Sequence, residues 1–167
     1  MMAKPNSSIP KQNEKWKDIK ATYRFYDSKK VEFLKLIQPH VNQTKIKVSK
    51  MKQILAIQDT CFVSYNHHPS VEGLSEIGGE KAVGKGIILH SSLAVDPSKK
   101  QPKVIGLLDQ YIHHRTKKVD KNESYLEKQK RWRESKIWEE TSQRSSINGS
   151  KVQIIEVMDR EGDVFDI

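Results

Sequence analysis

The chain of 167 residues, 35% hydrophobic and 31% charged, is long enough to form one globular domain with a hydrophobic core. Residues 1–15 hold no apolar stretch that would serve as a signal peptide and the later apolar runs are strand-sized, so the composition excludes a membrane protein and predicts a cytoplasmic one. The net charge of +9 lies wholly before Asp59, because residues 1–58 hold 13 Lys or Arg against 4 Asp or Glu and the remainder holds 17 of each.

The basic N-terminal third is expected to bind a polyanion. Double-stranded DNA is the leading partner, although a lysine-rich solubilising tail would have the same composition. Within this region residues 1–13 are rich in Pro, Asn and Ser, which predicts a flexible leader. Residues 14–52 form a basic segment whose apolar residues recur at helical spacing between Val31 and Val41, with Pro39 near the expected end of the helix.

Three strands are expected next. Basic and apolar residues alternate over 45–52 and lead into a β-type run that predicts the first strand over 54–65. The glycine-rich stretch 73–86 reads as an exposed loop. Two apolar runs, 87–95 and 104–112, are separated by a turn sequence and predict an antiparallel hairpin.

The C-terminal part returns to a helical pattern and then to a strand. A helix over 120–142 would present Trp132 and Trp138 on an apolar face, which is more typical of a core than of a base-stacking platform. The apolar run 152–157 suits a strand inside a sheet, parallel to the first strand. Residues 53–167 therefore predict an α/β, partial ribonuclease-H-like fold of three antiparallel strands, a helix and a parallel fourth strand, preceded by the small helical basic segment.

Two aspartates stand where a sheet could bring them together. Asp59 lies inside the first apolar strand, where a carboxylate is costly unless a cation compensates it, and Asp159 follows the last strand directly. Carboxylates at the ends of neighbouring parallel strands converge, and hard divalent cations prefer oxygen ligands. Each has an ordinary alternative, a bulge at Asp59 or a helix cap at Asp159.

A resemblance joins these pieces. The stretch Leu55-Ala56-Ile57-Gln58-Asp59-Thr60, with Ser64-Tyr65 after it, resembles the first aspartate strand of insertion-sequence transposases of the Tn-five type. Further matching pieces occur in the same order: Ala21-Thr22-Tyr23-Arg24-Phe25, His90-Ser91, Val104-Ile105-Gly106-Leu107-Leu108, Glu134-Ser135-Lys136-Ile137-Trp138 and Val157-Met158-Asp159-Arg160-Glu161-Gly162-Asp163. The resemblance covers residues 15–167 and depends on order and spacing more than on any one piece.

The resemblance implies a cut-and-paste DNA transposase with an Asp-Asp-Glu site. Asp59 and Asp159 would be the first two catalytic carboxylates and would bind Mg²⁺ or Mn²⁺, with transposon-end DNA as the substrate. Two such metal ions activate a water or a 3′-hydroxyl and stabilise the leaving oxygen of a phosphodiester. The residues expected to contact DNA are Arg24, Lys29, Lys30, Lys136 and Arg160, although a surface ion pair is an equal alternative for Lys136 and Arg160.

The sequence also departs from the family. The third carboxylate of the family lies well after the second, beyond Ile167, so we expect a truncated or split transposase that is inactive alone. Gln58 and Gly162 stand where Glu and Ala are usual. Three hypotheses remain open at this point: a transposase completed by a C-terminal chain or a full-length relative, a non-catalytic or inhibitory DNA-binding fragment, and a decayed gene product.

Several other patterns carry little functional weight. Residues 79–86 nearly spell a phosphate-binding loop, but Gly86 replaces the required Ser or Thr and a strand is expected where a helix should begin. The pairs His67-His68 and His113-His114 lack zinc-ligand spacing. Cys61 has no partner for a disulfide and is expected to be a small buried side chain.

Overall fold

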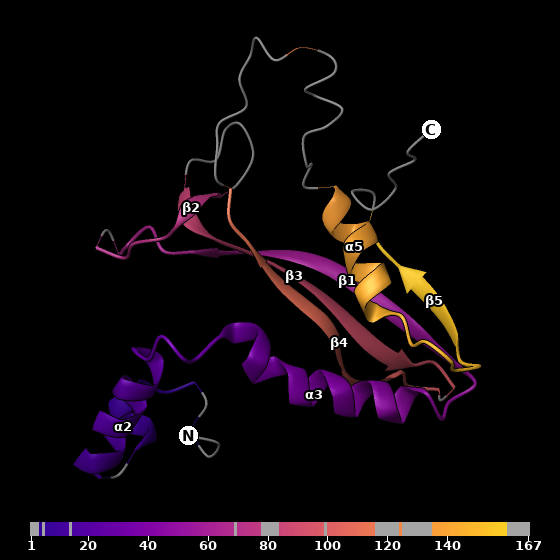
Figure 1. Cartoon of the computed structure of the whole chain (residues 1–167), viewed down its shortest axis with the longest axis horizontal. Helices are drawn as coiled ribbons and strands as arrows, with labels where there is room; N and C mark the ends of the chain where they lie inside the picture. The colour runs from indigo at the N-terminus through magenta and orange to yellow at the C-terminus, as the bar shows by residue number, and fades with distance from the viewer. Residues whose placement is uncertain are drawn as a thin grey trace. The chain divides into compact units, whose positions relative to one another are not determined.

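The computed structural model shows a mixed α/β protein with one five-stranded sheet and several helices (Figure 1). It describes residues 4, 6–13, 15–68, 70–77, 84–98, 100–115, 124 and 135–159. The chain divides into two compact units, Met1–Pro39 and His40–Ile167. The domain limits predicted from the sequence, after residues 13 and 52, stay a prediction. No helix within the described ranges is long and apolar enough to cross a membrane.

The first unit is helical. The expected leader contains a short helix, α1 (Ile9–Gln12), with Pro10 in its first turn. The main helix is α2 (Trp16–Tyr26), in which Lys, Ala and Arg favour the helix. Asp18 in the first turn and Arg24 in the last turn complement the helix dipole.

Helix α3 (Phe33–Val48) is longer than the sequence pattern predicts. Its predicted end near Pro39 is wrong, because the helix continues to Val48 and includes part of the stretch 45–52 whose basic and apolar residues alternate. The proline removes one helix bond, yet Val41, Thr44 and Val48 follow at helical spacing and are all buried. Burial of this face outweighs the local cost of the proline and the alternating pattern.

The sheet confirms the predicted hairpin and the parallel last strand. Its strands are β1 (Gln53–Ser64), β2 (Ser75–Ile77), β3 (Gly84–Asp96), β4 (Lys103–His113) and β5 (Gln153–Val157). The path runs β2, β3, β1, β5, and β4 also pairs with β3; only β1 and β5 pair in parallel among the described strands. The glycine-rich stretch is therefore not all loop, because β2 lies within it and β3 begins at Gly84.

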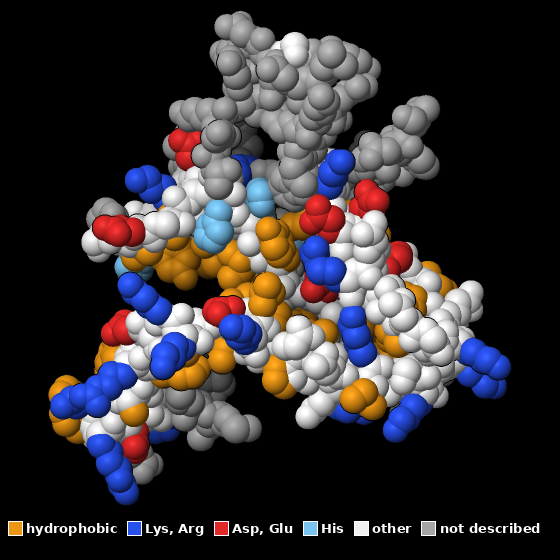
Figure 2. Space-filling view, in the orientation of Figure 1, with side chains coloured by type: hydrophobic (Ala, Val, Ile, Leu, Met, Phe, Trp, Pro, Cys, Tyr) orange, Lys and Arg blue, Asp and Glu red, His pale blue; other side chains and the backbone are white. Residues whose placement is uncertain are grey.

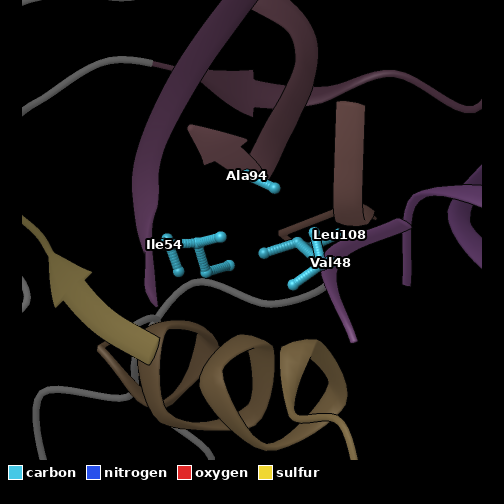
Figure 3. Packing of buried hydrophobic residues seen from close by; sticks show 5 residues of the cluster. Val48, Ile54, Ala94 and Leu108 are labelled. Atoms are coloured by element: carbon cyan, nitrogen blue, oxygen red, sulfur yellow. The ribbon is translucent and has the colours of Figure 1, made fainter. Parts of the chain in front are cut away.

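One face of the sheet carries the core. Ile54 and Ala56 of β1 cluster with Val48 of α3, Ala94 of β3 and Leu108 of β4, all five side chains being 0% exposed. Figure 3 shows these residues converging while α5 (Lys136–Ser145) runs past them. The side chains of β1 that alternate with the core residues project to the opposite face, as the pleat requires.

The opposite face of β1, called the open face below, keeps exposed side chains within the part of the chain that the structure describes. Cys61 is exposed on it, so the expected burial of this cysteine is wrong. Ile155 and Val157 of β5, which pair with the open-face residues of β1, keep more than a third of their surface exposed, at 37% and 39%. The strand was correctly predicted from its apolar run, but such a run does not reveal which of its two faces is buried.

Helix α5 (Lys136–Ser145) lies on the core face. Trp138 is buried, which confirms its assignment to the core; Trp132 and most of the predicted helix over 120–142 lie outside the described residues. Arg144 forms an ion pair with Asp109 of β4 at 2.8 Å. Lys45 of α3 donates to the carbonyl oxygens of Arg144 and Ser146, satisfying the C-terminal end of α5.

Gly106 on β4 marks the closest approach of α3 to the sheet. A Cβ atom at this position would lie 2.3 Å from Thr44 Oγ1, well inside van der Waals contact. Thr44 is 2% exposed and its hydroxyl donates to the His40 carbonyl at 3.0 Å, so this side chain has little freedom to move. The helix therefore packs here because glycine has no side chain.

We expect Gly106→Ala to lower the free energy of unfolding by about 1–3 kcal/mol, because the added methyl overpacks the contact with Thr44. Chemical denaturation measures this. Adding Thr44→Ala to the same chain removes the atom that the methyl meets and should recover part of the loss, as a double-mutant cycle would show. Unchanged stability of the single variant would contradict the close approach.

Candidate functional site

Helix α2 presents a stripe of basic and aromatic side chains. Trp16, Lys20, Tyr23 and Arg24 recur at intervals of four, three and one, which places them on one side of a helix. All four are exposed, Trp16 at 69% and Tyr23 at 47%. Figure 2 shows lysine and arginine side chains gathered over this helix. Cations bind phosphates and aromatic rings pack on sugars or bases, so this basic-aromatic stripe suits a nucleic acid.

The other predicted DNA contacts lie in different parts of the chain. Lys29 and Lys30 are exposed in the turn that follows α2, so they extend the positive charge beyond the C-terminal end of the helix. Lys136 is the first residue of α5 and is partly buried. Arg160 lies outside the described residues. Three of the five predicted contacts, Arg24, Lys29 and Lys30, therefore lie in the N-terminal unit.

Asp59 is exposed on the open face of β1. Its Oδ1 accepts the backbone N–H of Thr60 at 2.8 Å. The desolvation cost that the apolar sequence around it suggests does not arise, because alternation turns this side chain away from the core. An exposed carboxylate on a rigid central strand remains accessible to a cation or to a phosphate-bound metal ion.

Asp159 follows β5 on the neighbouring strand. The parallel register ends with Ile57 paired to Val157, and each aspartate lies two residues beyond that last pair. Neighbouring strands are about 4.8 Å apart. Both carboxylates also act electrostatically on the same side chain, His90 of β3. Both aspartates therefore follow the same end of the β1–β5 pairing.

Two carboxylates alone are a partial fit to a divalent metal ion. Their oxygens are the ligands that Mg²⁺ and Mn²⁺ prefer, and each aspartate lies two residues beyond the last parallel pair of β1 and β5. Within the described ranges no group of three or more His, Cys, Asp or Glu side chains is placed to hold a metal ion. A site built on Asp59 and Asp159 therefore has room for water, substrate oxygens or a further protein ligand.

A polar network that is buried at His90 and Gln58 and reaches the exposed Glu156 lies behind Asp59 on the core face. His90 is 0% exposed, and its Nδ1 lies 2.7 Å from Thr60 Oγ1 while its Nε2 lies 2.9 Å from Gln58 Oε1. Gln58 Nε2 donates to Glu156 Oε2 of β5 at 2.9 Å and to Ser142 Oγ of α5 at 2.8 Å. Trp138 meets the His90 ring edge to face, with centroids 4.5 Å apart.

Burial lowers the pKa of His90, and Arg144 lowers it further, while Asp109, Asp59 and Asp159 oppose the shift. The ring is therefore neutral at neutral pH. Sequence reasoning did not assign His90 a role. The sequence did hold a signal for a buried polar contact. Gln58 and His90 are large polar residues at strand positions whose side chains point to the core.

Comparison with known proteins gives one positive result. A protein-family model described as transposase DNA-binding matches residues 1–31, which include α2 and the basic-aromatic stripe. No curated protein matches the chain. The N-terminal segment is thus similar to transposase DNA-binding domains, which supports a transposase fragment and DNA as a partner.

Proposed function

We propose that the chain is the DNA-binding, two-aspartate part of a cut-and-paste transposase of the Tn-five type, with the ribonuclease-H-like fold of that family. One observation carries the DNA-binding part: the transposase DNA-binding match covers the same residues as the exposed basic-aromatic stripe of α2. The mixed sheet, with a parallel last strand beside the first, is compatible with the proposed fold.

In this proposal Asp59 and Asp159 hold Mg²⁺ or Mn²⁺. The parallel register of β1 and β5 supports the pairing, and the exposure of Asp59 leaves its carboxylate accessible to DNA. Bound metal ions would activate a water or a 3′-hydroxyl for in-line attack on a phosphodiester and stabilise the leaving oxygen. The aspartates themselves supply negative oxygen ligands from two adjacent strands.

We further propose that the third carboxylate comes from the C-terminal part of a transposase, outside residues 1–167. The open sheet face supports this, because parallel strand pairs are normally covered on both sides. Leu93, Ile155 and Val157 expose 36%, 37% and 39% of their surface there. A second function, a non-catalytic or inhibitory DNA-binding fragment, is favoured by the lack of a three-ligand group among the described residues.

Mn²⁺ should raise the melting temperature of the chain, and Asp59→Asn should remove most of that rise. At a Mn²⁺ concentration a hundredfold above its Kd, linkage adds about 2.7 kcal/mol to the free energy of unfolding. The Asn variant should also melt no lower than the parent without metal, because it removes repulsion between two close carboxylates. Thermal melting with and without Mn²⁺ measures both effects.

Glu139→Gln is a matched control for the loss of one negative charge. Glu139 is exposed on α5, away from the two aspartates, and Gln keeps an oxygen for its bond from Gln143. This variant should show the full Mn²⁺-dependent rise. An equal rise in the parent and in Asp59→Asn would show that Mn²⁺ binds elsewhere and would remove the basis for the shared site.

A further inference from the structure

His90 bonds to the residues on both sides of Asp59. Its two ring nitrogens reach Gln58 and Thr60, the residues immediately before and after the aspartate. Alternation along β1 directs these two side chains to the core face and that of Asp59 to the open face. A contact that fixes both neighbours therefore fixes the backbone from which the carboxylate projects.

The hydrogen-bond directions in this network are determined. A carboxylate only accepts, so Gln58 must donate its Nε2 to Glu156, which leaves Oε1 as the acceptor facing His90. The His90 proton then sits on Nε2. Nδ1 of the neutral ring is an acceptor, and the Thr60 hydroxyl donates to it. Each of these polar atoms has a partner, and such a network holds one arrangement.

The network also ties together the elements that carry the candidate site. Glu156 belongs to β5, three residues before Asp159, and Ser142 and Trp138 belong to α5. His90 itself pairs with Thr60 across β1 and β3. Through Gln58, one buried imidazole is thus coupled to both strands that bear the aspartates and to the helix behind them.

We propose that His90 is a positioning residue that sets the direction of the Asp59 carboxylate by holding Gln58 and Thr60 from the opposite face of the sheet. The metal-binding consequence depends on the proposed function, in which Asp59 is a ligand. The effect on the Asp59 side chain does not, because it follows from the hydrogen bonds alone. The two consequences can therefore be tested separately.

The first test measures the Asp59 side chain in the full chain without metal. Three-bond NMR couplings report its χ1 angle, which the bond from the Thr60 N–H to Oδ1 should keep near one rotamer. His90→Phe keeps a ring against Trp138 but removes both nitrogens, and the Asp59 couplings should become averaged. Thr60→Val removes one of the two bonds at nearly constant shape and should average them partly.

Ser92→Ala is the matched control. Ser92 lies on β3 two residues from His90, is 0% exposed, and its hydroxyl has no hydrogen-bond partner within the part of the chain that the structure describes. It should leave the Asp59 couplings unchanged. Unaltered couplings in both Thr60→Val and a folded His90→Phe would overturn the positioning role; if His90→Phe fails to fold by circular dichroism, Thr60→Val alone decides.

The second test measures Mn²⁺ affinity by calorimetry. Loss of an outer-shell partner typically weakens metal binding by 10- to 100-fold, so we expect about a tenfold loss in His90→Phe, a smaller loss in Thr60→Val and none in Ser92→Ala. Averaged couplings with no Asp59-dependent Mn²⁺ binding in the parent would refute the metal site while supporting the positioning role. Asp59-dependent Mn²⁺ binding in the parent, together with couplings that the variants leave unaltered, would support the metal site and refute the positioning role.

Discussion

Replacing Lys20 and Arg24 with Gln is expected to weaken binding to duplex DNA by roughly tenfold per residue at 0.1 M salt, if each neutralises one phosphate. Both side chains are exposed on the basic-aromatic stripe of α2, inside the segment that matches the transposase DNA-binding family. Each lost phosphate contact should also reduce the slope of log K against log salt by about 1. Fluorescence anisotropy at several salt concentrations measures affinity and slope together.

The control variant carries the same change in net charge elsewhere. Lys100 and Lys103 are exposed at the turn between β3 and β4, and replacing both with Gln also takes the formal charge from +9 to +7. If this pair weakens binding as much as the α2 pair, the net charge and not the stripe determines affinity, and the assignment to α2 is wrong.

The structure also decides how the N-terminal region can be tested. Deleting residues 1–52 removes the whole basic region, but it also removes Val48 of the core cluster and Thr44, which packs on Gly106. Such a deletion would expose the apolar face of β1, so lost DNA binding would not separate recognition from folding. Point substitutions on α2 avoid this, because none of them lies in the core cluster.

The sequence pattern correctly predicted the strands whose own residues favour a strand, but not the element that is held by distant contacts. The run Ile54–Ile57 gave a correct strand because it is a short apolar run of β-forming residues, and the parallel last strand followed from its own apolar run and the helix before it. Helix α3 was underestimated because Pro39 is a local signal, whereas the helix is held by contacts with the distant β4. Such contacts cannot be read from spacing along the chain.

The candidate site was predicted only in part for the same reason. The sequence picks out Asp59 and Asp159 as carboxylates at strand positions, and the resemblance gives them a role. The residues of the polar network behind them come from four different elements, β1, β3, β5 and α5. Gln58 departs from the usual Glu of the family, and its amide here donates to the Glu156 carboxylate, a bond that a second carboxylate at this position would replace with repulsion.

Residues 1–167 alone are expected not to cleave or join DNA, because Asp59 and Asp159 would leave the proposed two-metal centre one protein ligand short. Glu156 cannot supply that ligand, since its Oε2 accepts from Gln58 on the face opposite Asp59; Glu161 lies outside the described residues. A misaligned nucleophile and leaving group cost about 5 kcal/mol of barrier, which slows the reaction by between about 10³ and 10⁴. Incubation with transposon-end DNA and Mg²⁺ or Mn²⁺ should therefore show no nicking.

Adding a separately expressed C-terminal region from a close relative should restore nicking if the chain is one part of a transposase. The restored activity must disappear with Asp59→Asn, which keeps the side-chain shape but weakens the metal ligand. Nicking by residues 1–167 alone that depends on Asp59 would show that the two-aspartate site is already sufficient. No activity in the mixture, with DNA binding through α2 intact, would favour the non-catalytic DNA-binding function, because the same stripe can occupy transposon ends without any chemistry at Asp59.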